Sequence, residues 1–392
     1  MPYAHLIVSD GAAAARDGVR VTYLGTNGYQ FESNGHALLV DPYFSRVDFW
    51  SVALGARIQP NASRINDAMR HVKTKVDAIL VTHGHFDHLF DVPLVMSKTH
   101  ARLIASASSI ELVRQLQDAG ASSVDPVTPG SVRRIGPWKI RVLSATHDRL
   151  FGKVPFDQSE RRNPGPPQRP RDWICGQPLA FLIEINGQRI YIDSGGTPAQ
   201  LPPNVHVDLA ILGMALPDSR ARLVAALEHL QPRYILPSHQ DNFFLPLNAG
   251  FQFGQLTDFP RVQRDCARAS HGRLILLDYF RQWTLPRHQA AAVSSKSQNS
   301  NPKQGTKTQS FTKCAASRGR WRCLWCDEAR GKAMRGRIAL PKSGSRTKQE
   351  ETSPWILREA LLECDASSHR FWFVESSRLS FAWDSELPDC MK

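Results

Sequence analysis

A short apolar run that leads directly into a cluster of histidines constrains this chain more than any other feature. Val76 and residues 78–81 have the composition of a buried β-strand. The next residues are Thr82-His83-Gly84-His85-Phe86-Asp87-His88, so three histidines and one carboxylate stand within six residues. Imidazole nitrogens and carboxylate oxygens are ligands that Zn²⁺ prefers, and one loop can divide them between two adjacent ions. The alternative is a solvated turn that is rich in histidine by coincidence, and the density of ligand-type residues after a strand disfavours it.

Other predicted strands also end at a residue that can bind metal. The segment 37–40 ends at Asp41-Pro42, residues 138–143 lead to His147, residues 189–192 lead to Asp193, and residues 234–236 lead to His239. Asp41 and His147 have ordinary structural alternatives, because an Asp before Pro is a common turn cap and a lone histidine is more often structural than a ligand. Between these segments, the Asn-Gly pairs at 27–28, 34–35 and 186–187 predict hairpin turns.

His83-x-His85-x-Asp87-His88 resembles the signature of the metallo-β-lactamase-fold hydrolases. That family binds one or two metals between two β-sheets flanked by helices. The resemblance implies an α+β four-layer αββα sandwich over residues 19–286. It also implies the ligands of two ions. The first ion would be held by His83, His85 and His147, and the second by Asp87, His88 and His239, with Asp193 bridging both.

The same resemblance assigns roles around the metals. It places Asp41 behind the site, where its carboxylate would fix the ring direction of a ligand histidine. Two zinc ions are expected, with manganese and iron as alternatives, and they would activate a bridging water for hydrolysis. Asp87 and Asp193 are the predicted catalytic carboxylates, Asp87 as a proton shuttle to the leaving group. The β-lactamases of the best-known zinc class have Cys where this chain has Asp193, which argues against β-lactamase activity.

Three further segments resemble the branch of the family that includes ascorbate-6-phosphate lactonase. They are residues 21–25 (Val-Thr-Tyr-Leu-Gly), residues 40–42 (Val-Asp-Pro) and residues 239–244. The diiron redox branch, by contrast, has Glu at the position of His85. The resemblance therefore implies a hydrolase of an ester, a lactone or a phosphodiester.

Residues 149–177 form a long segment rich in Pro, Arg and Gly. Such a loop inside a compact domain is usually a functional lid or an irregular insertion. Because it follows His147, we interpret it as a basic flap whose arginines would hold a phosphate or carboxylate of a small anionic substrate. The alternative is a solvated surface insertion. The aromatic residues of the segment 45–72 either line the substrate site or belong to the core.

Composition separates the last hundred residues from the rest. Residues 288–392 contain 18 Lys and Arg against 11 Asp and Glu, and five of the seven cysteines. Residues 293–310 have a linker composition, so we predict that residues 287–392 are a poorly ordered basic extension. Its C-x₂-C pair, Cys323 and Cys326, lacks a suitably spaced second pair for a structural zinc site.

The net charge of +13 and the basic, Trp-containing extension support an alternative function, a metal-dependent nuclease. A non-catalytic scaffold of the same fold is a third possibility, but all seven ligand positions carry suitable residues. The sequence shows neither a secretory signal nor an apolar run of roughly 20 residues, so a cytoplasmic location is expected.

Overall fold

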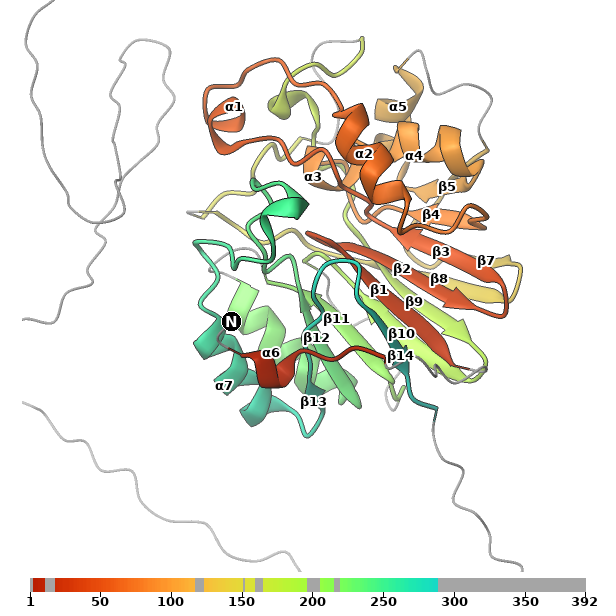
Figure 1. Ribbon diagram of the computed structural model, residues 1–392, viewed down its shortest axis with the longest axis vertical. Coiled ribbons are helices and arrows are strands. Elements are labelled where there is room, and N and C mark those ends of the chain that lie inside the picture. Colours follow the sequence, from red (N-terminus) through yellow and green to blue (C-terminus); the bar gives the residue numbers. More distant parts are fainter. Residues whose placement is uncertain are drawn as a thin grey trace, which may run out of the picture. The chain divides into compact units, whose positions relative to one another are not determined.

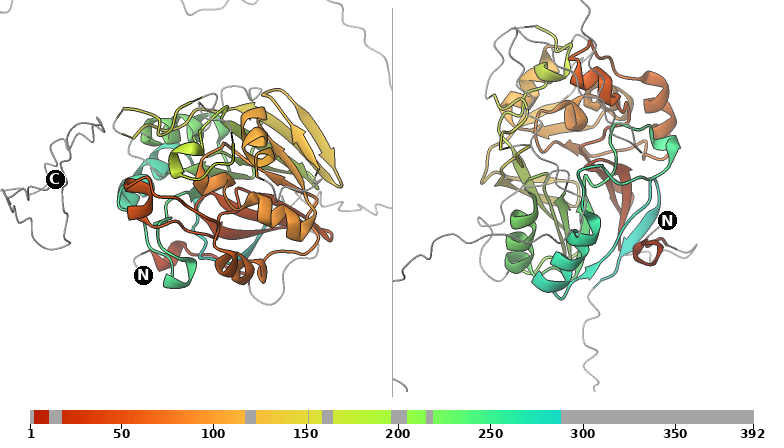
Figure 2. Two further views of the ribbon diagram at one scale, coloured as in Figure 1. Left: turned by 90° about the horizontal axis from the view of Figure 1, so that it is seen from above. Right: turned by 90° about the vertical axis from the view of Figure 1, so that its left-hand side faces the viewer.

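The computed structural model describes residues 3–10, 18–116, 123–150, 152–158, 165–195, 205–214 and 219–287. Within these residues two seven-stranded β-sheets face each other, and helices cover the outer face of each (Figure 1; Figure 2). The predicted αββα order of layers is therefore confirmed. The predicted extension, apart from Arg287, lies outside the described residues and stays a prediction.

The first sheet has the strand order β14-β1-β2-β3-β4-β5-β6. Strands β14 to β3 are antiparallel, whereas β3 to β6 are parallel. The three strands expected between residues 19 and 40 are present, joined by turns at the two predicted Asn-Gly pairs. The bounds are β1 Val19–Gly25, β2 Gly28–Ser33, β3 His36–Val40, β4 Ala78–Leu80, β5 Arg102–Ala105, β6 Val124–Pro126 and β14 Gln282–Leu285.

The second sheet has the order β13-β12-β11-β10-β9-β8-β7. Strands β7 to β10 are antiparallel and β10 to β13 are parallel. The expected strand over residues 273–277 is shorter than predicted, since only its first two residues pair in the sheet. The bounds are β7 Val132–Ile135, β8 Trp138–Ser144, β9 Leu179–Ile185, β10 Gln188–Ile192, β11 Leu209–Gly213, β12 Tyr234–Ser238 and β13 Arg273–Leu274.

Among the described residues, helices α1 to α5 lie on the side of the first sheet and α6 and α7 on the side of the second (Figure 1). The first group is α1 Phe49–Ala53, α2 Ala62–Met69, α3 Phe86–Leu89, α4 Val92–Thr99 and α5 Ala107–Arg114. The second group is α6 Ser219–Leu230, as predicted, and α7 Phe259–Ala269. Helix α7 starts later than the expected residue 255 because Asp258 caps it by accepting from the Arg261 amide, and Pro260 suits the first turn. Short 3₁₀ helices are η1 Ala4–Leu6, η2 Pro170–Asp172 and η4 Leu247–Ala249.

Strand β3 shows how one continuous apolar run serves two layers. Leu38 and Val40 belong to the core between the sheets, and Ala37 and Leu39 to the core under the helices. Side chains of a strand alternate between its faces, and both faces of this strand are covered. A strand in such a position must be apolar throughout, as the sequence of β3 is.

The strand directions bring the predicted ligands together. In the first sheet β3 and β4 are parallel, so their carboxyl ends, near Asp41 and His83, lie at one edge. In the second sheet β8 and β10 both run antiparallel to β9, and β10 to β12 are parallel. The residues that follow β8, β10 and β12 therefore share one edge of that sheet, which is where His147, Asp193 and His239 stand.

None of the helices in the described part of the chain is long and apolar enough to cross a bilayer. The two cysteines that the structure describes, Cys175 and Cys266, are buried free thiols. Burial raises the pKa of each thiol to about 12, so neither is a reactive thiolate near neutral pH.

A fully buried ion pair stands beneath the edge that carries His239. The Arg46 guanidinium donates to Asp241 Oδ2 over 2.9 Å, and both side chains are inaccessible to solvent. Asp241 also accepts hydrogen bonds from the Thr26 amide at 3.1 Å and from the Tyr279 hydroxyl at 2.6 Å. The pair therefore joins the turn after β1, the loop after β3 and the loop after β12.

We predict that Arg46→Met lowers the free energy of unfolding by about 3–5 kcal/mol, because it leaves the Asp241 carboxylate buried without its cation. Urea denaturation followed by circular dichroism measures the change. Arg70 is the matched control, since its ion pair with Asp67 is exposed on both sides. Arg70→Met should change stability by less than about 1 kcal/mol. Equal effects of the two substitutions would contradict the role given to the buried pair.

Candidate metal centre

The loop after β4 and the short helix α3 that follows it carry four predicted ligands, and the shape of the loop depends on Gly84. A Cβ atom at this position would lie 2.3 Å from the carbonyl oxygen of Ile174. The Gly84 amide donates to the Cys175 carbonyl over 3.0 Å. Only glycine permits this close approach, so the residue between His83 and His85 is fixed by packing against the backbone at 174–175.

His83, His85 and His147 form the first of two clusters of potential ligands. One nitrogen from each ring lies within 4.8 Å of the other two. His83 Nε2 and His85 Nδ1 lie 3.0 Å apart. His147 joins from the segment after β8, and its Nδ1 donates to the Asp148 carbonyl over 2.7 Å. Its Nε2 is thereby the nitrogen left for a ligand role.

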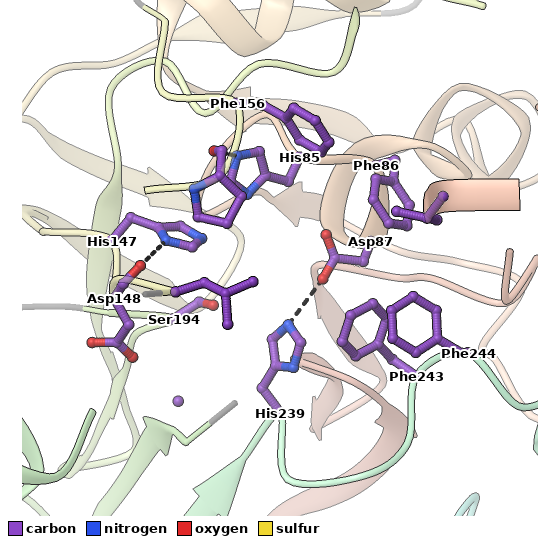
Figure 3. Close-up of a pocket in the computed structure, with 14 residues that line it drawn as sticks. His85, Phe86, Asp87, His147, Asp148, Phe156, Ser194, His239, Phe243 and Phe244 are labelled. Atoms are coloured by element: carbon purple, nitrogen blue, oxygen red, sulfur yellow. Dashed lines mark hydrogen bonds and ion pairs between the residues drawn. The ribbon is translucent and has the colours of Figure 1, made fainter. Parts of the chain in front are cut away.

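Asp87, His88 and His239 form the second cluster, and all three are buried. Asp87 Oδ2 lies 2.9 Å from His239 Nε2 and 3.5 Å from His88 Nε2. Figure 3 shows the Asp87 carboxylate and the His239 ring facing each other across the site. The structure thus groups six of the seven predicted ligands into the two sets expected from the sequence.

The donor atoms of both clusters suit a small divalent cation. Zinc bound at about 2.0–2.1 Å with tetrahedral geometry places its ligand atoms about 3.3 Å apart. Three separations in the clusters, of 2.9, 3.0 and 3.5 Å, are close to that value, and all ligand atoms of a cluster lie within 4.8 Å of one another. His239 Nδ1 is buried and has no hydrogen-bond partner within the described part of the chain. The residues present therefore fit metal ligation.

The protonation states are those that metal binding needs in the first cluster. Burial, followed by the neighbouring histidines, lowers the pKa of His83 well below its ordinary value. Burial likewise lowers the pKa of His85 to about 3 and also lowers that of His147. These rings are neutral near pH 7, as a ligand must be.

In the second cluster the carboxylates decide the charges. Burial would raise the pKa of Asp87, but His88 and the hydrogen bond from His239 outweigh it, and the pKa is lowered. Burial would lower the pKa of His88, but Asp87 and Asp41 outweigh it, and the pKa is raised. Asp87 is therefore an anion near neutral pH, suited to a cation beside it.

Asp41 holds the second cluster from behind. Its Oδ2 lies 2.8 Å from His88 Nδ1 and accepts from the Asn27 side chain at 2.8 Å and the Thr82 hydroxyl at 2.6 Å. Its Oδ1 accepts from the Thr82 amide at 2.8 Å. Because His88 Nδ1 is engaged by Asp41, its Nε2 is turned toward Asp87. This is the geometry in which an outer carboxylate orients a ligand histidine.

Asp193 stands apart from both clusters. Its Oδ1 accepts from the Gly213 amide at 3.1 Å and from Arg222 Nη1 at 3.1 Å. Its Oδ2 is buried and accepts no hydrogen bond from the described residues. Burial raises the pKa of the nearby Tyr191 phenol, and the Asp193 carboxylate raises it further. One oxygen is thus fixed by the protein, whereas the other is buried near the Tyr191 phenol.

Arg222 of α6 ties the loops after β8 and β10 to each other. Besides Asp193 it contacts both oxygens of Asp148, at 2.9 and 3.0 Å. Backbone contacts add to this link, since the Thr146 amide donates to the Gly195 carbonyl over 2.7 Å. A Cβ atom at residue 195 would lie 2.3 Å from Thr146 O, so only glycine allows the approach. The positions of His147 and Asp193 are therefore coupled.

A cavity of about 220 Å³ opens beside the clusters. Four of the predicted ligands line it (Figure 3): His85, Asp87, His147 and His239. Most of its other lining is apolar, and no Lys or Arg occurs among the lining residues that the structure describes. The apolar lining residues are Val52, Phe86, Leu150, Pro155, Phe156, Phe243 and Phe244.

The described part of the loop over residues 149–177 covers the His85 side of the centre with apolar residues. The Pro155 carbonyl lies 2.8 Å from His85 Nε2, and the Phe156 ring stands 6.0 Å from the His85 ring. The prediction of an anionic substrate rested on the arginines of this loop. None of them is among the described residues that line the cavity. Arg169 donates to the Gly55 carbonyl at 2.5 Å, whereas Arg161 and Arg162 lie outside the described residues.

Sequence reasoning did not single out Arg222, Asp148 or the apolar lining as functional. Asp148 had a local signal, since it directly follows His147. Arg222 had none, because it lies within an ordinary helix and reaches the site only through the packing of α6. Of the segment 45–72, Val52 lines the cavity and Ile58 belongs to the core, whereas the aromatic residues Phe49 and Trp50 are exposed and belong to neither.

Comparison with known proteins gives the family. The family model of the β-lactamase superfamily domain matches residues 36–240, just over half of the chain. A metal-dependent hydrolase of Anaeromyxobacter dehalogenans is 26% identical over 243 residues, which cover 59% of this chain and 77% of that protein. One from Rubrobacter xylanophilus is 27% identical over 239 residues, covering 58% of this chain and 85% of that protein.

Among solved structures, a metallo hydrolase of Ignicoccus hospitalis has a TM-score of 0.46 at 17% identity, covering 69% of this chain and 99% of that one. The metallo-β-lactamase fold protein YhfI of Bacillus subtilis also has a TM-score of 0.46, at 14% identity, covering 68% and 99%. Such scores are too low to carry an argument, so the assignment rests on the family model and on the order of the layers. The curated relatives are named metal-dependent hydrolases, which is the enzyme class expected from this sequence. The chain therefore belongs to the β-lactamase superfamily and has the metallo-β-lactamase fold.

Proposed function

We propose that this protein is a binuclear metal-dependent hydrolase, with zinc as its first candidate metal. His83, His85 and His147 would hold one ion, and Asp87, His88 and His239 the other. The observation that carries the proposal is the presence of two separate three-residue clusters beside one cavity. The curated relatives are themselves named metal-dependent hydrolases, which supports it.

Asp193 is our candidate for the ligand shared by both ions. The support is its buried Oδ2, which accepts no hydrogen bond from the described residues, and its Oδ1, which Arg222 and a backbone amide hold. A carboxylate fixed at one oxygen presents the other in a defined direction at no further entropic cost. The charge of Arg222 also offsets the charge of Asp193 inside the protein.

Divalent ions in these clusters would lower the pKa of a coordinated water and polarise the oxygen of the scissile group. The chain supplies the remaining functions. Asp87 lines the cavity as a carboxylate and is the candidate for carrying a proton to the leaving group. The apolar residues of the 149–177 loop exclude water from the His85 side.

The described cavity favours an uncharged ester or lactone over a phosphodiester. A phosphodiester is an anion, and proteins usually bind such groups with Arg or Lys. The described lining contains neither. The nuclease alternative depends on residues 288–392, which the structure does not describe. The lactonase resemblance agrees with an ester or lactone bond, although it had favoured an anionic substrate, and the cytoplasmic location stays a prediction.

The metal content of purified protein tests the two-ion proposal. We expect about two zinc ions per chain by elemental analysis, as in two-metal sites generally. His147→Ala and His239→Ala should each lose one equivalent, because each removes a ligand from a different cluster. His229→Ala is the control, since His229 is exposed on α6, and it should retain both ions.

Hydrolysis of p-nitrophenyl acetate and simple lactones by the same samples completes this test. Turnover should disappear with chelator and return with zinc. Folded wild-type protein that takes up no zinc and stays inert after zinc is added would refute the proposed function.

We also predict that Asp41→Asn weakens zinc binding by about 10–100-fold, as loss of an outer-shell carboxylate does at other metal sites. Competition with a fluorescent chelator measures the affinity. Asp77→Asn is the matched control. Asp77 pairs with His36 at 3.0 Å, as Asp41 pairs with His88, but it is remote from both clusters. If the two variants bind zinc equally well, Asp41 has no orienting role.

A further inference from the structure

A line of aromatic rings runs from the second cluster to the surface of α1. The His239 ring stands 5.0 Å from Phe243, which stands 4.2 Å from Phe244. The Phe244 ring is 5.4 Å from Phe49, and Phe49 is 5.3 Å from Trp50. We call Phe243, Phe244, Phe49 and Trp50 the aromatic track. Figure 3 shows its inner half, with Phe243 and Phe244 side by side next to Asp87.

The outer half of the track is unusually exposed. Phe49 is 52% and Trp50 55% accessible to solvent, and both are at the start of the five-residue helix α1. Scattered exposed apolar residues need no explanation, but a contiguous group marks a binding surface more often. This group is continuous with the cavity, because Val52 of the same helix lines it.

The cavity is small, which suggests that the outer rings of the aromatic track also contact the substrate. About 220 Å³ is less than the roughly 300–1,000 Å³ typical of small-molecule sites. A substrate larger than the cavity must extend out of it. The aromatic track is an apolar route from the candidate metal ligands to solvent, and a nonpolar chain on it would cover the exposed rings of Phe49 and Trp50.

We propose that the substrate is an ester or lactone with an extended apolar chain, which lies on the aromatic track while its carbonyl group is at the metal centre. The position of the carbonyl rests on the proposed function. The position of the chain rests only on the track. The occupant is thus the hydrophobic tail of a small amphiphile, such as a medium-length acyl group.

Binding of straight-chain carboxylates with two to eight carbons tests the proposal. These are the product class of such a substrate, and calorimetry on the zinc-loaded protein measures their affinity. Each buried CH₂ group contributes about 0.8 kcal/mol, so each added carbon should tighten binding by about threefold to fourfold. The gain should continue to the longest chains, because the track extends beyond the cavity.

Substitutions at the outer end of the track separate it from the cavity. Phe49→Ser and Trp50→Ser should leave acetate binding unchanged and weaken octanoate binding by about tenfold or more, since they remove apolar surface only under the far end of the chain. Val132→Ser is the matched control. Val132 is also an exposed apolar residue, 46% accessible, but it is on β7, so its loss should change neither affinity.

Two results would overturn the proposal. One is an affinity that does not rise with chain length, and the other is a rise that Phe49→Ser and Trp50→Ser leave intact. Chelator-sensitive hydrolysis of p-nitrophenyl acetate, assayed in the same preparation, reports on the metal centre separately. Its absence would count against the proposed function, whereas the dependence of affinity on chain length decides the aromatic track alone.

Discussion

The Asp41 carboxylate is the contact on which the geometry of the centre depends. It joins the turn after β1, the end of β4 and the short helix α3 through Asn27, Thr82 and His88. Asp41 itself has a φ of 40°, a left-handed conformation that costs a non-glycine residue of the order of 1–3 kcal/mol. His239, in the facing sheet, has a φ of 57°. Both strained residues are at the candidate centre, where surrounding contacts hold them in place.

The two sheets contribute unequally to the centre, and this suggests how it is assembled. The loop after β4 supplies four candidate ligands in six residues, whereas the second sheet supplies single residues from separate loops. Those separate loops need fixing to one another. Arg222, the Gly195 backbone and the buried Arg46–Asp241 pair provide the fixed points. Ligands that are distant in sequence thus depend on buried polar contacts that no motif records.

The cavity lining within the described residues differs in character from the composition of the loop beside it. A loop rich in arginine predicted an anion, because arginine is a common ligand for phosphate and carboxylate. In the folded chain the part of this loop that meets the centre is apolar, through Leu150, Pro155 and Phe156. The composition of a segment averages over residues that point in different directions, so it did not reveal which of them face the cavity. The same limit hid the aromatic track, whose members come from two distant segments.

The sequence by itself determined most strands, because alternation, Asn-Gly turns and apolar runs are local signals, and the family resemblance implied the order of the layers. It also indicated the ligand types, since four of them are adjacent and the family resemblance places the others. The strand 273–277 and the start of α7 were less well predicted, because sheet pairing and capping decide where elements end. Only the tertiary structure decided that Arg222 reaches Asp193, that His88 is the histidine held by Asp41, and that the described cavity lining beyond the candidate ligands is mostly apolar. These depend on distances between residues far apart in the chain, which packing sets and local sequence does not encode.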